Sequence, residues 1–283
     1  MTDYNGIENV KVFEASDVKL PDRDTVTNKG DCGRLLVFGG DRGMAGAAYF
    51  SAESAYRSGT GLVEILTHPD NRIPIQTLIP EAIASFWDQW DAKRINSYSA
   101  LTVGVGLGKS DIARKLLYRI LSVVRKPTVI DADALNIISD THELLGFLGT
   151  HTVLTPHLLE FSRLTGVSVD GISKDTFAYA QDFAKRYNTN LVLKDKISVI
   201  ALANGETFAN VTGDSTLSKG GSGDVLAGLI GSLLAQGMPM ERAVPTAVFL
   251  HGRAGEQAGK RWGVRGALAR DLLKELALTI KDF

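Results

Sequence analysis

One stretch, Ser218 to Gln236, places the tightest constraint on how this chain folds. It reads SKGGSGDVLAGLIGSLLAQ, a glycine-rich turn from Lys219 to Asp224 followed by apolar residues at the spacing of a helix face. The apolar residues are Val225, Leu226, Leu229, Ile230, Leu233 and Leu234. The pattern predicts a loop that runs directly into the N-terminus of a helix.

Such a helix start is suited to binding an anion. Its first N–H groups have no partner within the helix, the helix dipole is positive there, and glycines let the backbone approach a ligand closely. Asp224 falls in the first helical turn, where it is placed to act as a base beside the anion. The alternative is structural: Ser222 or Asp224 only caps a core helix. The turn alone does not decide between the two.

Composition narrows the classes of protein that this chain can be. Its 283 residues carry 31 Lys and Arg against 32 Asp and Glu, a formal net charge of −1. The electrostatic attraction that drives binding to nucleic acid or anionic membranes is therefore missing, and small molecules are the favoured ligands. The single cysteine, Cys32, cannot form an internal disulfide, and the polar start MTDYNGIENV lacks a signal-peptide pattern. Together these features predict a cytoplasmic location.

Short apolar runs alternate with helical patterns along the chain. Strands are predicted at residues 34–38, 62–66, 101–105, 128–130, 152–154 and 191–194, with a hairpin at 198–203 and 207–211. Helices are predicted at 45–58, 112–124, near 142–148, 158–164 and 175–187, before three closing helices. This alternation predicts an α/β fold whose mostly parallel sheet is covered on both faces and binds ligands beyond its C-terminal strand ends. Because no repeat or linker interrupts it, we expect a single domain over residues 1–283.

Two glycine motifs come close to known nucleotide-binding signatures and fail. Gly39, Gly40, Gly43 and Gly46 would need glycine at 41 to make a dinucleotide-binding turn, and that position is Asp41. VGVGLGKS would need glycine at 103 to make a P-loop, and that position is Val103. Ser110 or Asp111 is then expected to cap the following helix. The glycines at 104, 106 and 108 still imply close backbone approach, by a neighbour or a ligand.

Several polar residues at strand ends have both a functional and a structural interpretation. Asp131 and Asp133 could hold Mg²⁺ directly or through water, or Asp133 could cap the turn that follows. His157 lies between a strand and a helix, where it could touch a ligand or play a structural part. Glu160, three residues on, shares its helical face. Glu53, Arg57 and Glu64 are interpreted as partners in surface ion pairs.

Several motifs taken in chain order resemble one family. They are GGDRGMAGAA with SGTGLV, then GVGLG, DADALN, TPHLLEFSRLTG, LVLKDKISVIA and GGSGDVLAG. Each alone is weak, but together they cover nearly the whole chain after Lys29 and resemble the ADP/ATP-dependent NAD(P)H-hydrate dehydratases. The resemblance implies a ribokinase-like, three-layer α/β/α fold with a mostly parallel central sheet. It also implies that a nucleotide's terminal phosphoryl group passes to the C6 hydroxyl of a hydrated nicotinamide cofactor, after which phosphate is eliminated.

The resemblance implies a role for individual residues. Asp224 would be the catalytic base and touch the substrate, and the backbone of Gly221, Ser222 and Gly223 would form the anion hole. Ala47, Gly108 and His157 would line the pocket for the hydrated dinucleotide. The adenine nucleotide would be held by Lys194, Asp195, Lys196, Ile197, Ser198 and Gly223. Mg²⁺ is expected as a cofactor with no protein ligand assigned, and two alternatives stay open: protein carboxylates hold the ion, or chiefly phosphate oxygens do.

The family pattern implies a lyase that converts (6S)-NADHX and NADPHX to NADH and NADPH, with ADP favoured over ATP as the donor. Many relatives carry an N-terminal epimerase domain, for which this chain has no room, so action on the S epimer only is expected. Relatives often form homotetramers, which predicts an oligomer here. Two alternatives stay open: a kinase of hydroxymethylpyrimidine, hydroxyethylthiazole or sugar type, and a non-catalytic nucleotide-binding module. Sugar kinases of this fold carry Asn-x-x-Glu where this chain has His157 to Glu160, which favours the dehydratase.

Two positions depart from the family pattern. Asp195 follows Lys194 where glycine is usual, which adds a carboxylate near the expected nucleotide. Asp41 stands where serine is usual in the first glycine turn, and there it would repel a pyrophosphate unless the side chain of Arg42 compensates its charge. We expect Arg42 to do so.

Overall fold

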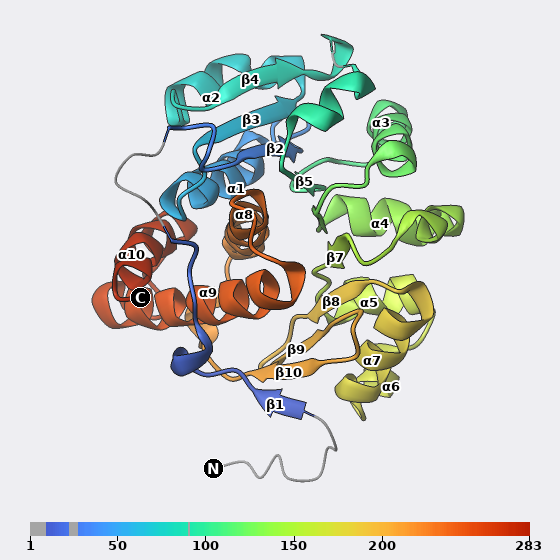
Figure 1. The fold of residues 1–283 in the computed structure, drawn as a ribbon, viewed down its shortest axis with the longest axis vertical. Helices are drawn as coiled ribbons and strands as arrows, with labels where there is room; N and C mark the ends of the chain where they lie inside the picture. Colours follow the sequence, from blue (N-terminus) through green and yellow to red (C-terminus); the bar gives the residue numbers. More distant parts are fainter. Residues whose placement is uncertain (1–9, 23–27, 90) are drawn as a thin grey trace.

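The computed structural model describes residues 10–22, 28–89 and 91–283, and its ten described strands form one sheet in the order β1-β10-β9-β8-β7-β6-β5-β2-β3-β4. The strands are β1 (Val10–Val12), β2 (Arg34–Phe38), β3 (Leu62–Thr67), β4 (Ile83–Phe86), β5 (Ala100–Val103), β6 (Thr128–Ile130), β7 (Thr152–Leu154), β8 (Asn190–Leu193), β9 (Ser198–Ala201) and β10 (Thr207–Asn210). Only β9 runs antiparallel to its neighbours, and every other described pairing is parallel. The curved sheet runs down the middle of the molecule in Figure 1.

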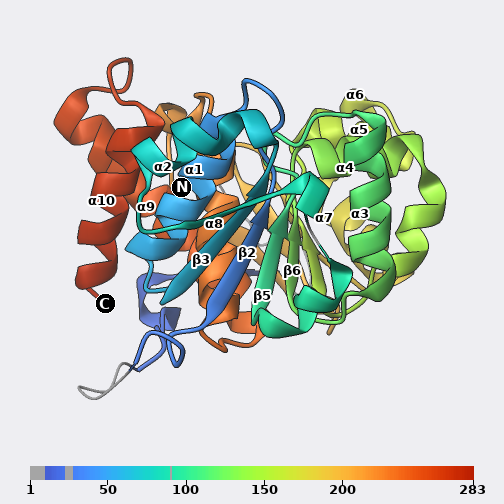
Figure 2. The same cartoon turned by 90° about the horizontal axis from the view of Figure 1, so that it is seen from above.

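Helices cover both faces of the sheet, as Figure 2 shows. They are α1 (Ala45–Arg57), α2 (Arg72–Leu78), α3 (Asp111–Val123), α4 (Asp133–Asp140), α5 (Leu158–Thr165), α6 (Val169–Ile172), α7 (Thr176–Tyr187), α8 (Ser222–Ala235), α9 (Met240–Trp262) and α10 (Ala269–Lys281). The apolar residues of β2 alternate between the two resulting cores. Leu35 and Val37 pack with α1, α8, α9 and α10, whereas Leu36 and Phe38 pack with α3, α4, α5 and α7.

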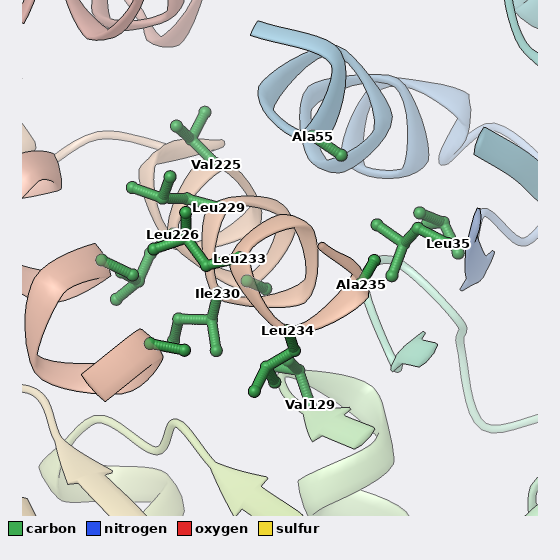
Figure 3. Packing of buried hydrophobic residues seen from close by; sticks show 14 of the residues in the cluster. Leu35, Ala55, Val129, Val225, Leu226, Leu229, Ile230, Leu233, Leu234 and Ala235 are labelled. Carbon is green, nitrogen blue, oxygen red and sulfur yellow. The ribbon is translucent and has the colours of Figure 1, made fainter. Parts of the chain in front are cut away.

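Helix α8 is the centre of the first core, as Figure 3 shows. Its apolar residues from Val225 to Leu234 are buried, which confirms the face predicted from their spacing. Two glycines let α8 approach its neighbours: a Cβ on Gly228 would lie 2.0 Å from the carbonyl oxygen of Ser51, and one on Gly231 would lie 2.2 Å from Oγ1 of Thr102. This close packing fixes where the N-terminus of α8 emerges at the sheet edge.

The observed architecture confirms the predicted α/β fold and its mostly parallel sheet. The helix predicted near 142–148 is a 3-10 helix at His142–Phe147, and the strand predicted at 101–105 is β5, at Ala100–Val103. Elements β1, α2, β4, α4 and α6 were not predicted. Among the described helices, none is both long and apolar enough to cross a membrane.

Candidate active site

A cavity of about 1110 Å³ lies at the C-terminal edge of the sheet, above β8, β9 and β10. One wall is the segment Lys194–Ser198 that joins β8 to β9, and another is the start of α8 at Ser222 and Gly223. His157, which follows β7, also lines it. All six residues predicted to bind the nucleotide therefore line one cavity.

Asp224 lies in the first turn of α8, partly buried. Among the described residues, no group donates a hydrogen bond to its carboxylate. Burial raises the pKa of Asp224 to about 7, and the negative charges of Asp131 and Asp133 add to that rise against the opposing charge of Lys194. A carboxylate whose pKa lies near neutral pH and which has no fixed hydrogen-bond donor is suited to accept a proton from a substrate.

A buried ion pair lies beside the start of α8. The Nζ atom of Lys194 is 3.0 Å from Oδ1 of Asp131, whose side chain is only 3% exposed. The hydroxyl of Thr155 donates to the same carboxylate oxygen at 2.7 Å. Burial alone would lower the pKa of Lys194, but the nearby charges of Asp131, Glu160 and Asp224 outweigh it and hold that pKa above its usual value. Lys194 is therefore a permanent cation, and its side chain is 23% exposed.

The predicted anion hole is only partly free. Gly221, in the left-handed region at φ 94°, is the N-cap of α8. The N–H of Ser222 donates to the carbonyl oxygen of Lys219 at 3.2 Å, whereas those of Gly221, Gly223 and Asp224 find no acceptor among the described residues. A Cβ on Gly223 would touch Lys194 Nζ at 3.4 Å, so the backbone here lies directly against the ammonium group. Three N–H groups and one cation thus meet at the start of α8.

His157 caps helix α5. Its Nδ1 accepts hydrogen bonds from the N–H groups of Leu159 and Glu160, while the Glu160 carboxylate accepts one from the His157 N–H. Burial and the charge of Lys194 lower the pKa of His157, which keeps the imidazole neutral at neutral pH. The side chain is half exposed and lines the cavity, and its Nε2 lies 3.5 Å from a carboxylate oxygen of Glu160.

Ala47 and Gly108 lie outside this cavity, near the ends of β2 and β5. A Cβ on Gly106 would lie 2.8 Å from that of Ala47, and one on Gly108 would lie 2.3 Å from Oδ2 of Asp41. The glycine turns after β2 and β5 therefore pack against each other. The backbone N–H of Gly108 donates to Asp133 at 2.8 Å, so Asp133 ties this region to the Asp224 side of the sheet edge.

The expectation that the Arg42 side chain compensates Asp41 is wrong. The Arg42 guanidinium pairs with Asp70, with 2.8 Å between Nε and Oδ2, and only its backbone N–H bonds the Asp41 carboxylate. Asp70 follows β3 and is no sequence neighbour, which is why the pairing was not foreseen. Ser110, in contrast, caps α3 through the N–H of Ala113, as predicted.

The far wall of the cavity was missed by sequence reasoning. It is formed by Asn210 to Ser215, which follow β10, and by Leu226, Val248, His251 and Gly252. A pattern that could have predicted this wall is the strand β10, which ends at the same sheet edge and is followed by Gly213, with φ 99°.

His251, on α9, is buried beneath the start of α8. It is 7% exposed and donates from Nε2 to the Ser222 carbonyl at 2.9 Å, and burial lowers its pKa to about 4. A neutral histidine thus holds the start of α8 from below.

The described residues hold no group of three or more His, Cys, Asp or Glu side chains able to bind a metal ion. The Asp131 carboxylate is engaged by Lys194 and Thr155, and Asp133 by Gly108. This donor set fits a Mg²⁺ ion held chiefly by phosphate oxygens rather than one in a cage of protein ligands.

Comparison with known proteins gives a consistent result. A family model described as NAD(P)H-hydrate dehydratase (Carb_kinase) matches residues 35–278. The bifunctional NAD(P)H-hydrate repair enzyme Nnr of Vibrio cholerae is 36% identical over 259 residues, which are 91% of this chain and 51% of that protein. The chain spans about half the length of this and the other bifunctional relatives that it matches. The ADP-dependent (S)-NAD(P)H-hydrate dehydratase of Bacillus subtilis is 34% identical over 93% of this chain and 95% of its own.

Two solved structures extend the likeness. A ribokinase-like superfamily protein from Enterococcus faecalis superposes with a TM-score of 0.89 at 26% identity, covering 98% of this chain and 97% of that one. The ADP/ATP-dependent NAD(P)H-hydrate dehydratase of Bacillus subtilis, co-crystallized with ATP and Mg²⁺, superposes with a TM-score of 0.84 at 30% identity. That match covers 98% of this chain and 99% of the other, and the two together confirm the ribokinase-like fold.

Proposed function

The chain belongs to the NAD(P)H-hydrate dehydratase family, and we propose that it dehydrates (6S)-NADHX and NADPHX to NADH and NADPH with ADP as phosphoryl donor. The name of the Bacillus subtilis relative, which the chain covers almost end to end, supports both the S epimer and ADP. The ATP and Mg²⁺ in the solved Bacillus subtilis structure support an adenine nucleotide as co-substrate. The reaction would be one of metabolite repair.

The chain's own residues supply a base and an anion site for this reaction. Asp224 would take the proton of the C6 hydroxyl while that oxygen bonds to the terminal phosphorus of ADP and the bond to the leaving AMP breaks. The free N–H groups of Gly221, Gly223 and Asp224 would donate to the phosphoryl oxygens as charge builds on them. Loss of phosphate from C6 and of a proton from C5 then restores the reduced nicotinamide.

The observation that carries the proposal is the position and state of Asp224. Its carboxylate accepts no hydrogen bond from the described residues and has a pKa of about 7. The residue lies in the first turn of α8, beside a cavity large enough for a nucleotide. A carboxylate with only a capping role would accept a bond from a backbone N–H of its own helix.

We place the nucleotide in the cavity, against Lys194 to Ser198 and Gly223. The hydrated dinucleotide would lie on the other side of Asp224, toward Ala47 and Gly108, with His157 at the boundary. When bound, Mg²⁺ would neutralise phosphate charge and would be held chiefly by phosphate oxygens. A homotetramer, a single domain over residues 1–283 and a cytoplasmic location stay predictions.

Absorbance at about 340 nm tests the proposal, because only reduced nicotinamide absorbs there. The purified protein is mixed with S-epimer hydrated NADH, Mg²⁺, and either ADP or ATP. We expect a rise with ADP and release of one inorganic phosphate per NADH. No rise with either nucleotide would overturn the dehydratase, and a stable phosphorylated product would indicate a small-molecule kinase instead.

A further inference from the structure

Asp131 is a buried carboxylate that the proposed reaction leaves without a role. Its side chain is 3% exposed, and its Oδ1 is held by both Lys194 and Thr155. Its Oδ2 faces the start of α8, 3.8 Å from where a Cβ on Gly223 would lie. A buried charge is costly unless its partners are well placed, and the Lys194 ammonium is the charged partner that stabilises the Asp131 carboxylate.

The backbone of Lys194 is fixed as firmly as its side chain. Its N–H donates to the Pro156 carbonyl at 2.8 Å, which extends the parallel pairing of β7 and β8 by one bridge to His157. The side chain then runs to Asp131, which takes one of the three N–H donors of the ammonium group. The remaining two donors find no acceptor among the described residues, and the group lies against Gly223 at the cavity wall.

We propose that Asp131 is a positioning residue, which clamps the Lys194 ammonium against the start of α8 so that its two free N–H groups meet the phosphoryl group in transfer. The proposal rests on the assigned function of the Asp224 site. Without Asp131, a lysine on its flexible four-carbon stem would sample other positions, and the cation would not be held where charge develops.

The same pair sets the charge around the base. Asp131 and Asp133 oppose ionisation of Asp224, and Lys194 favours it. The charges of Asp131 and of Glu160, on α5, raise the pKa of Lys194. The lowered pKa values of His157 and His251, on the α5 and α9 sides, keep both imidazoles neutral. Replacing Asp131 by asparagine therefore removes a charge that opposes ionisation of Asp224 and, by releasing Lys194, also removes the charge that favours it.

A double-mutant cycle tests the clamp. Calorimetry with ADP and Mg²⁺ measures the Kd of the wild type, Asp131→Asn, Lys194→Met and the double variant. We expect each single change to raise the Kd about tenfold, and the double variant to bind no more weakly than Lys194→Met alone, because both act through one ammonium group. Additive effects, or an Asp131→Asn Kd within twofold of wild type, would overturn the proposal.

A second readout separates positioning from a merely structural role. A ¹³C NMR titration of the Asp224 carboxyl in the free protein needs no substrate, so it stands even if the 340 nm assay fails. Asp131→Asn should lower the Asp224 titration midpoint less in the wild-type background than in the Lys194→Met background, where no ammonium group is left to release. The matched control is Asp140→Asn, which removes an exposed partner of Arg114 and should change neither midpoint nor Kd. Equal midpoint shifts in the two backgrounds would show that Asp131 does not position Lys194 and is only structural.

Discussion

Two carboxylates of the molecule have opposite surroundings. Glu64, in β3, is fully buried and is held by Arg34 at 2.8 Å and Arg94 at 2.6 Å, with a further hydrogen bond from Ser85. Burial alone would raise the pKa of Glu64, but these partners lower it below its usual range. Asp224 is only partly buried, has no donor among the described residues, and has a pKa raised to about 7.

The difference separates a charge that holds the fold from one that is kept ready for chemistry. Glu64 has a partner for each oxygen, so its charge is stabilised and cannot easily take a proton. Asp224 lacks such partners, so the folded protein bears the cost of its charge. An uncompensated, partly buried carboxylate beside a cavity is the feature that points to function, whereas a buried carboxylate with all its partners points to a structural role.

The largest effect should come from Asp224→Asn. Because the amide cannot accept the C6 hydroxyl proton, the dehydration rate should fall about a thousandfold. The rate is measured as the ADP-dependent absorbance rise with S-epimer hydrated NADH. A fall of less than about tenfold would count against Asp224 as the base.

Glu64→Gln should lower the stability of the protein and leave its turnover nearly unchanged, the reverse of the effect expected for Asp224→Asn. The amide cannot pair with two guanidinium groups, so the free energy of unfolding should fall by about 3 kcal/mol, at the lower end for a broken buried pair because both arginines are partly exposed. Turnover per folded molecule should stay within about twofold of wild type. Urea unfolding and active-site titration measure the two quantities, and an unstable but also inactive variant would blur the distinction between the two carboxylates.

Asp224→Asn should also stabilise the protein, in a pH-dependent way. Since the folded pKa of Asp224 lies above its unfolded value, ionisation costs stability as the pH rises from about 4 to about 7. The asparagine variant avoids this cost, so it should gain about 1–3 kcal/mol above pH 7 and nothing below pH 4. Thermal unfolding at both pH values measures the gain. If Asp224→Asn is less stable than wild type at both pH values, the charge of the Asp224 carboxylate is compensated in the folded protein.

The smallest effect concerns Asp195, a carboxylate in the cavity wall that departs from the family pattern. Replacing it by glycine removes a negative charge near the expected phosphates, so the KM for ADP should fall about twofold to fivefold with kcat unchanged. Steady-state rates at varied ADP concentration measure this change. A higher KM would mean that Asp195 binds the nucleotide rather than repels it.

Local patterns were enough to predict most of the fold. The apolar spacing of residues 225–234 predicted α8, and short apolar runs bounded by glycine predicted the central strands. Elements β1 and β4 were missed because they are short edge strands that gain their order from pairing with β10 and β3. Helix α4 was missed because Asp131 and Asp133 had been weighed as metal ligands or a turn cap.

The contacts that the sequence analysis did not predict at the site join residues that are far apart in the chain. Arg42 finds Asp70, and Asp131 finds Lys194, 63 residues along the chain. Glu64 was expected to lie in a surface ion pair, but it is fully buried in β3, where neighbouring strands bring its partners. Glu53 and Arg57, four residues apart on α1, do pair at 2.8 Å, because that contact is set by helix geometry alone.

The most direct test of the account is the pH dependence of kcat/KM for dehydration, measured with ADP from about pH 5.5 to 8.5. If the unpartnered Asp224 carboxylate is the base, kcat/KM should rise tenfold per pH unit at low pH and level off near pH 7, and the residual rate of Asp224→Asn should show no such inflection. A flat wild-type profile, or an inflection that survives in Asp224→Asn, would contradict the assignment.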